Sequence, residues 1–120
     1  MDTTKNKSAR RFLILTVEPL SNKGKSYRLG LMSFDFLELK TEIQLIESVK
    51  VKLGNAVGNI TINDNSSLKT YKEFGKLVNS AISNWITTKG LQNTTKGNPC
   101  KIVFEIKRNR KEHIYSIYSN

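Results

Sequence analysis

The side chains that could act as a nucleophile or as an acid–base pair are few in this chain. It holds one Cys, Cys100, one His, His113, and ten Asp and Glu residues. Cys100 follows Pro99 at the start of a strand-like segment, where a thiol is more often a small core residue than a nucleophile. The sequence shows no orienting partner for either group. We therefore expect no catalytic residues and no enzyme activity.

Metal and phosphate-loop chemistry has equally little support. One Cys and one His cannot build a zinc site or an internal disulfide. The carboxylates that come nearest to a nuclease-type metal cluster are Asp35, Glu38 and Glu42, but Glu38 and Glu42 alternate with Lys40 as on a solvated strand. The glycines lack the spacing of Walker or dinucleotide loops. The sequence predicts no metal and no cofactor.

Binding through positive charge is the chemistry that remains. The chain has 20 Lys and Arg against 10 Asp and Glu, a formal net charge of +10 over 120 residues. Such a surplus attracts a polyanion, which releases counterions when it binds, although charge can also serve solubility alone. The cations are densest in the segment Lys107-Arg108-Asn109-Arg110-Lys111. Nucleic acid is therefore the leading expected partner.

Proteins that bind single strands combine cations that follow the phosphates with aromatic rings that stack on bases. We expect Tyr27 and Tyr115 to stack bases, with core packing as the alternative for each Tyr. The residues expected to contact phosphates are Lys107, Arg108, Arg110, Lys111, Arg28, Lys50, Lys52, Arg10 and Arg11.

The elements that must position these groups are predicted from the spacing of apolar residues. Residues 9–20 form an apolar run that predicts a strand buried on both faces, and residues 26–34 alternate as its hairpin partner. In residues 35–53 the apolar side chains fall mainly at odd positions, which favours one long bent strand, with a bulge near 46–48, over a helix. Residues 60–62 are predicted to return as a short strand.

The second half of the chain predicts one helix and one hairpin. Thr70 and Glu73 have the spacing of a capping box, and the apolar stripe that follows continues to a basic last turn and a stop at Lys89-Gly90. The segment Cys100 to Tyr118 is predicted as a hairpin with the basic segment at its tip. A helix-turn-helix is disfavoured, because only one helix is predicted.

This order of elements predicts a mainly β protein with one α-helix, of the α+β class. The specific expectation is a small five-stranded barrel of the oligonucleotide/oligosaccharide-binding (OB) type, with the helix before the C-terminal hairpin. Residues 10–120 are expected to form this single domain and residues 1–9 a flexible basic arm. Neither a membrane-length apolar run nor a secretory signal is present, so we expect a cytoplasmic protein that does not enter membranes.

The run from Leu39 to Ser67 resembles the small single-stranded DNA-binding proteins of bacteriophages and other mobile elements. The resemblance is carried by Val49-Lys50-Val51 before a Gly-Asn loop and by Asn63-Asp64-Asn65-Ser66 leading into Tyr71-x-x-Phe74. It implies a barrel-type protein that coats single strands during replication, recombination or transfer. Many of these proteins recruit partners through acidic tails, and Ser116 to Asn120 is not acidic, so we do not expect tail-mediated recruitment here.

The sequence therefore predicts a non-catalytic protein that binds single-stranded DNA, or RNA, non-specifically, as a homodimer or a cooperative array. A second hypothesis is a protein-interaction module or inhibitor that presents its basic face to an acidic partner. A third keeps nucleic acid as the ligand but replaces the barrel by a curved sheet backed by the helix, dimeric like transcription cofactors that grip melted DNA.

Overall fold

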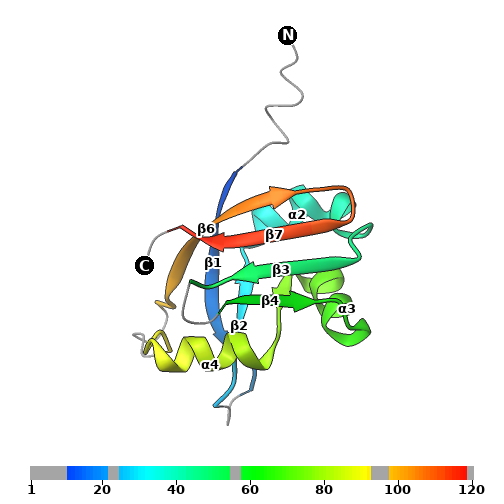
Figure 1. The fold of residues 1–120 in the computed structure, drawn as a ribbon. Helices are drawn as coiled ribbons and strands as arrows, with labels where there is room; N and C mark the ends of the chain where they lie inside the picture. Colours follow the sequence, from blue (N-terminus) through cyan, green and yellow to red (C-terminus); the bar gives the residue numbers. More distant parts are fainter. Residues whose placement is uncertain (1–10, 22–24, 55–57, 93–97, 119–120) are drawn as a thin grey trace.

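The computed structural model describes residues 11–21, 25–54, 58–92 and 98–118 (Figure 1). Within these residues, seven strands form one sheet and three helices pack against it. The elements in chain order are β1 (Phe12–Pro19), β2 (Tyr27–Leu31), α2 (Ser33–Ile43), β3 (Ser48–Lys52), β4 (Asn59–Ile62), α3 (Asn65–Phe74), β5 (Lys76–Leu77), α4 (Ser80–Thr88), β6 (Lys101–Arg108) and β7 (Glu112–Ile117). The expected basic arm, residues 1–9, and Arg10 lie outside the described residues.

The strand order in the sheet is β4-β3-β7-β6-β1-β2-β5. Only β3 and β7 pair in parallel, and all other neighbours are antiparallel. Figure 1 shows β3, β4 and β7 running across the direction of β1 and β2, with β6 curving from one direction to the other, so that the sheet forms a half-barrel. The mainly β, α+β class is confirmed. The expected count of five strands and one helix is wrong, because the described residues contain seven strands and three helices.

The two faces of this sheet differ in burial, and we call them the inner and the outer face. In β1 the inner residues Leu13, Leu15 and Val17 are at most 5% exposed, whereas Phe12 and Ile14 on the outer face are 44% and 40% exposed. Inner-face residues of the strands join buried residues of all three helices in one hydrophobic cluster. The prediction that β1 is buried on both faces is therefore wrong.

Residues 35–53 do not form the long strand that was predicted. They contain most of α2, a turn, and then β3. Leu37 and Leu45, which contributed to the alternating pattern, are each 67% exposed. The buried residues of α2 follow a helical period instead: Asp35, Leu39 and Ile43. Period-two alternation holds only within β3, where Val49 and Val51 are buried.

The single helix predicted between residues 70 and 90 is instead two helices separated by the short strand β5. Helix α3 ends because Gly75 adopts a left-handed conformation, with a φ of 71°, and its N–H donates to Tyr71 O at 2.9 Å. A Cβ at Gly75 would lie 2.7 Å from Phe36 Cδ1, so this position needs a glycine for two reasons. The next residues extend the sheet, with Leu77 paired to Leu29 of β2.

The predicted capping box at Thr70 is also wrong, since α3 begins earlier. Asp64 caps this helix and accepts a 2.9 Å hydrogen bond from the Ser67 backbone N–H. That bond lowers the pKa of the exposed Asp64 carboxyl. Thr70 lies inside the helix, where its hydroxyl donates to Ser66 O.

The C-terminal hairpin is confirmed as β6 and β7. Ile102, Phe104 and Ile106 alternate inward as expected. None of the helices in the described ranges is long and apolar enough to cross a membrane.

Candidate nucleic-acid interface

The outer face of β4, β3, β7, β6 and β1 brings together three of the predicted binding residues, Lys50, Lys52 and Lys107, and we call this surface the open face. The strand registers place Lys50 of β3, Ile114 of β7 and Lys107 of β6 side by side in one row. Lys50 and Lys107 are two strands apart, which corresponds to about 10 Å between their backbones. The next row contains Lys52, Ser116 and Glu105.

Four lysines of the open face make no ion pair with any described residue: Lys50, Lys52, Lys101 and Lys107. Three carboxylates share the surface, and one of them, Glu18 of β1, is paired with Arg28 and Lys76. Glu105 lies 3.5 Å from the Arg11 guanidinium, and Glu112 accepts a hydrogen bond from Ser48 Oγ at 3.2 Å. The open face therefore carries a positive excess that its own carboxylates do not neutralise.

An exposed pair of aromatic rings lies on the same surface. The rings of Phe12 and Tyr118 meet edge to face, with centroids 4.7 Å apart and planes at 65°. Phe12 is 44% and Tyr118 63% exposed, and the 40% exposed Ile14 lies two residues along β1. Exposed rings among unpaired cations are the arrangement on which single-strand binders stack bases.

Three of the predicted phosphate contacts, Lys50, Lys52 and Lys107, come together on the open face, although they are far apart in the sequence. Lys50 and Lys52 point outward as predicted, because Val49 and Val51 take the inner positions. The predicted long strand was wrong here, yet its last five residues have the predicted orientation.

Arg28 faces outward too, but it belongs to a separate ion-pair cluster. Its Nε lies 2.9 Å from Glu18 Oε1, and Lys76 Nζ lies 2.9 Å from Glu18 Oε2. The cluster lies directly over Gly30, where a Cβ would be 2.7 Å from Glu18 Oε2. Arg28 is thus already paired and is not part of the open face.

The cations of the basic segment at the hairpin tip differ in their burial and in their partners. Arg108 points to the inner side and donates to both carboxylate oxygens of Glu42, through Nε at 3.1 Å and Nη2 at 3.3 Å. Lys111 Nζ lies 3.3 Å from Glu47 Oε2, with both side chains about two-thirds exposed, and Arg110 is exposed at the tip. Of the four cations of this segment that were expected to contact phosphates, Arg108 is thus already paired with Glu42.

The two residues predicted to stack bases, Tyr115 and Tyr27, differ in burial. Tyr115 is fully buried and its hydroxyl is hydrogen-bonded to the Tyr71 hydroxyl at 2.5 Å, so its ring cannot receive a base. Tyr27 is half-buried and packed against the core, and its backbone N–H donates to Ser83 Oγ at 2.9 Å. The core alternative holds for Tyr115 outright, because β7 turns that position inward.

The only histidine lies in a buried chain of hydrogen bonds that runs from Glu42 through His113 and Tyr71 to Tyr115. His113 Nε2 is 2.7 Å from Glu42 Oε2, and its Nδ1 is 2.8 Å from the Tyr71 hydroxyl. Burial lowers the pKa of His113, and its hydrogen bond to Glu42 counters this in part. A neutral ring satisfies every group: Nε2–H donates to Glu42, Tyr71 donates to Nδ1, and Tyr115 donates to Tyr71.

This chain of bonds connects helices α2 and α3 to strand β7. His113, Tyr71 and Tyr115 each have no exposed surface, so no substrate can reach them as the structure stands. Burial raises the pKa of both Tyr71 and Tyr115 far above the usual range, with the neighbouring Tyr115 adding to the effect at Tyr71. The network therefore has a structural role: three neutral side chains, hydrogen-bonded in series to the Glu42 carboxylate, hold α2, α3 and β7 together.

Sequence reasoning missed two residues of the open face, Phe12 and Lys101, and it did not include Tyr118 in the final set of binding residues, although this ring was one of the strand aromatics considered for stacking. Phe12 was assigned to a strand buried on both faces. Glu18 lies an even number of residues further along the same strand, so both side chains are on one face, and a carboxylate there indicates that this face is exposed. Attention to that one carboxylate would have identified the exposed ring. Lys101 precedes the inward Ile102, so its outward orientation follows from the alternation in β6. What local patterns do not show is that β6 lies between β1 and β7, which brings Lys101 and Tyr118 onto the same surface as Phe12.

The chain matches no protein-family model, no curated protein and no solved structure. The resemblance to single-stranded DNA-binding proteins of bacteriophages and mobile elements stays a prediction. The element order on which part of it rested is wrong at α2, where a strand was expected.

Proposed function

We propose that the open face binds single-stranded nucleic acid without sequence preference, DNA in the first instance. The observation that carries this proposal is the exposed Phe12–Tyr118 ring pair among four lysines that have no carboxylate partner in the described residues. By the resemblance, the protein would coat single strands in the replication, recombination or transfer of a mobile element. A dimer or a cooperative array would extend the surface along a strand.

A single strand fits this surface better than a duplex does. Rings can stack only on bases whose faces are free, and these are available in an unpaired strand. Duplex readers usually insert a helix into the major groove. Here the buried residues of α2, α3 and α4 join the inner-face core instead.

The test is a titration of the protein against end-labelled single-stranded DNA, single-stranded RNA and duplex DNA, followed by fluorescence anisotropy at several salt concentrations. We expect single strands to bind more tightly than duplex. The logarithm of the binding constant should fall linearly with the logarithm of salt, with a slope of about −0.7 for each phosphate contacted. Absence of binding at low salt, or an affinity that ignores salt, would refute the proposal.

Two triple lysine substitutions distinguish the contribution of the open face to binding from the effect of the protein's net charge. The triple substitution Lys50→Gln, Lys52→Gln and Lys107→Gln should reduce the salt slope by about 2, since each lost contact removes about 0.7. The control is Lys40→Gln, Lys69→Gln and Lys72→Gln, which removes the same charge from helices α2 and α3. Equal losses in both triples would show that charge acts globally, and the open face would lose its role.

A competition experiment distinguishes a nucleic-acid site from a general surface for acidic partners. Polyglutamate carries the charge of a strand but has no bases to stack. We expect it to displace a labelled oligonucleotide only weakly at equal charge. If polyglutamate competes as well as an unlabelled strand, the surface binds acidic polymers in general and the alternative of an acidic protein partner is favoured.

A further inference from the structure

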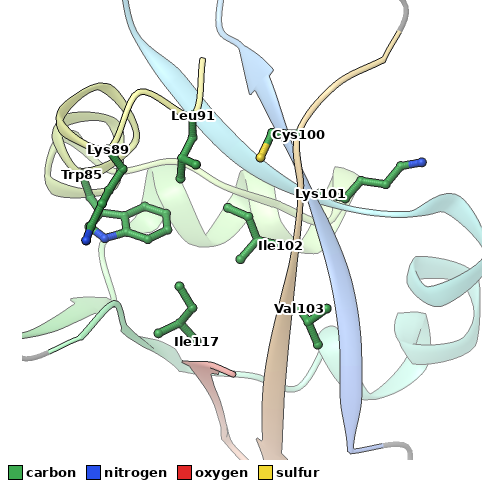
Figure 2. A pocket seen from close by; sticks show the side chains of 8 residues that line it. All are labelled: Trp85, Lys89, Leu91, Cys100, Lys101, Ile102, Val103 and Ile117. Atoms are coloured by element: carbon green, nitrogen blue, oxygen red, sulfur yellow. The ribbon is translucent and has the colours of Figure 1, made fainter. Parts of the chain in front are cut away.

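A cavity of about 470 Å³ lies between the end of α4, the start of β6 and the end of β7. Figure 2 shows the ring of Trp85 from the helix facing Ile102 and Ile117 from the two strands, with Leu91 above them. The volume falls within the range of small-ligand pockets, and such pockets combine apolar walls with a few polar groups. Binding of a strand to the Phe12–Tyr118 ring pair does not by itself assign a role to this cavity.

One buried polar group at the cavity has no partner. Trp85 is only 5% exposed, and its indole N–H is one of two buried side-chain polar atoms without a hydrogen-bond partner in the described residues. Burying a donor without an acceptor is unfavourable, so such a group is a sign of a missing ligand or water. Lys89 follows one helical turn later, its N–H bonded to Trp85 O at 3.0 Å, which places both side chains on the same side of α4.

The charges at the cavity are all positive. Lys89 and Lys101 are the charged residues among those that line it, and no carboxylate is among them. Figure 2 shows Lys89 beside Trp85, whereas the Lys101 side chain extends away from the cavity, toward the outer side of β6. The complementary ligand has an apolar body and an anionic group. A planar ring with acceptor atoms along its edge fits better than an acyl chain, since it can contact the indole and also accept from its N–H.

The cavity is continuous with the open face. Lys101 and Val103 line the cavity and also face outward on β6, where Val103 pairs with Ile14 of β1. The Tyr118 N–H donates to Val103 O at 2.9 Å, so one of the stacking rings follows directly on this wall. A strand lying over the Phe12–Tyr118 pair therefore reaches the mouth of the cavity.

We propose that this cavity receives one base of the bound strand, with the adjoining phosphates held by Lys89 and Lys101 and the base edge accepting from the Trp85 N–H. The inference rests on the proposed function of the open face. It predicts that a free nucleoside monophosphate, which carries the same ring and phosphate, enters the cavity as well.

The chain carries its own reporters for this test. Trp85 is the only tryptophan and Cys100 the only cysteine, and both line the cavity. Tryptophan emission and the rate of Cys100 alkylation by iodoacetamide can therefore be followed in the unlabelled full chain. The additions would be a thymidine oligonucleotide, adenosine monophosphate and decanoate, while an end label on the oligonucleotide reports strand binding separately.

We expect the oligonucleotide and adenosine monophosphate to change the Trp85 emission and to protect Cys100. At about ten times the dissociation constant, alkylation should slow about tenfold, because only about a tenth of the cavities remain empty. Lys89→Gln should raise the concentration of adenosine monophosphate needed for half-protection about tenfold through loss of one charged contact. Lys40→Gln on α2 is the matched control and should leave that concentration unchanged.

The outcomes separate this inference from the proposed function. If the strand binds by anisotropy while Trp85 and Cys100 stay unchanged, the open face stands and the base pocket is refuted. If decanoate protects Cys100 and the nucleotide does not, the cavity is an acyl-chain site and the inference is overturned. If no strand binds at low salt, the proposed function fails and this inference falls with it.

Discussion

The two faces of the β6–β7 hairpin carry the same kinds of side chain in opposite situations. On the open face, Lys107 has no carboxylate partner in the described residues, and Tyr118, just after β7, is 63% exposed. On the inner face, Arg108 is held by Glu42, and Tyr115 is fully buried against Tyr71. Lys107 and Tyr118 are therefore available to a ligand, whereas Arg108 and Tyr115, which carry the same kinds of side chain, are not.

The difference shows that a count of cations and rings does not locate a binding surface. Buried polar groups must be paired within the protein, so Arg108 and Tyr115 on the inner face form their hydrogen bonds with other residues of the fold. Groups on the open face are solvated by water, which a strand can displace. A comparison between the two faces therefore predicts which variants damage stability and which damage binding.

The largest effect is expected from breaking the inner network at its centre. Tyr71→Phe removes the hydroxyl that both His113 and Tyr115 contact, and it leaves two buried groups without a partner. Each such group destabilises by about 1–3 kcal/mol, so we expect a loss of about 3 kcal/mol in the free energy of unfolding. Urea unfolding followed by Trp85 fluorescence measures it.

Tyr115→Phe is the matched control for that variant. It removes the terminal donor and leaves only one acceptor lone pair unsatisfied on Tyr71, so the loss should be about 1 kcal/mol. Equal losses in the two variants would contradict the assigned direction of the hydrogen bonds. Neither variant should change the salt slope of strand binding.

The next effect concerns the rings of the open face. Phe12→Ala and Tyr118→Ala should each weaken strand binding by about 1–3 kcal/mol, the usual contribution of one stacked base. The control is Phe74→Ala at the end of α3, whose ring is 59% exposed and lies away from the open face. Anisotropy titrations at one salt concentration suffice, and an equal loss for Phe74→Ala would remove the case for a stacking site.

A smaller effect distinguishes the neutral network from a charged one through pH. The pKa of His113 is lowered in the folded protein, so the unfolded chain binds the proton more readily. Stability should therefore fall as pH is lowered from about 7.5 through the unfolded pKa near 6.5, by at most about 1.4 kcal/mol per pH unit. His113 is the only histidine, so His113→Gln should abolish the pH dependence in this range. Stability that rises between pH 7.5 and 5.5 would show a protonated His113 paired with Glu42.

The smallest effect compares two neighbouring cations. Lys107→Gln should reduce the salt slope of strand binding by about 0.7, the value for one lost phosphate contact on a single strand. Arg108→Gln should leave that slope unchanged and lower stability instead, because Arg108 pairs with Glu42 on the inner side. A slope that falls in both variants would place both cations on the strand and erase the contrast between the faces.

Several features of the fold were predictable from local patterns. The apolar run at β1, the alternation in β2 and β6 and the apolar return arm at β7 identified both hairpins, and Val49 and Val51 oriented Lys50 and Lys52 outward. Such patterns depend on side chains two residues apart, which the chain displays directly. The mainly β, α+β class and the positive surplus follow from the same level of information.

Other features depended on contacts that no local pattern shows. Leu37 and Leu45 completed an alternating pattern although both remain in solvent. Gly75 ends α3 where an apolar stripe continues, because its backbone turns left-handed against Phe36. In both cases the apolar residues were identified correctly. The secondary structure that they form was not, because it depends on contacts with distant parts of the chain.

The sequence by itself determined the class of fold, the two hairpins and the excess of positive charge, because these follow from residue types and short spacings. Only the tertiary structure decided which cations and rings stay open. That depends on β7 pairing with β3 in parallel and on β6 lying between β7 and β1. These pairings join residues far apart in the chain, and they place Lys107 and Tyr118 in solvent while Glu42, Tyr71 and His113 enclose their neighbours.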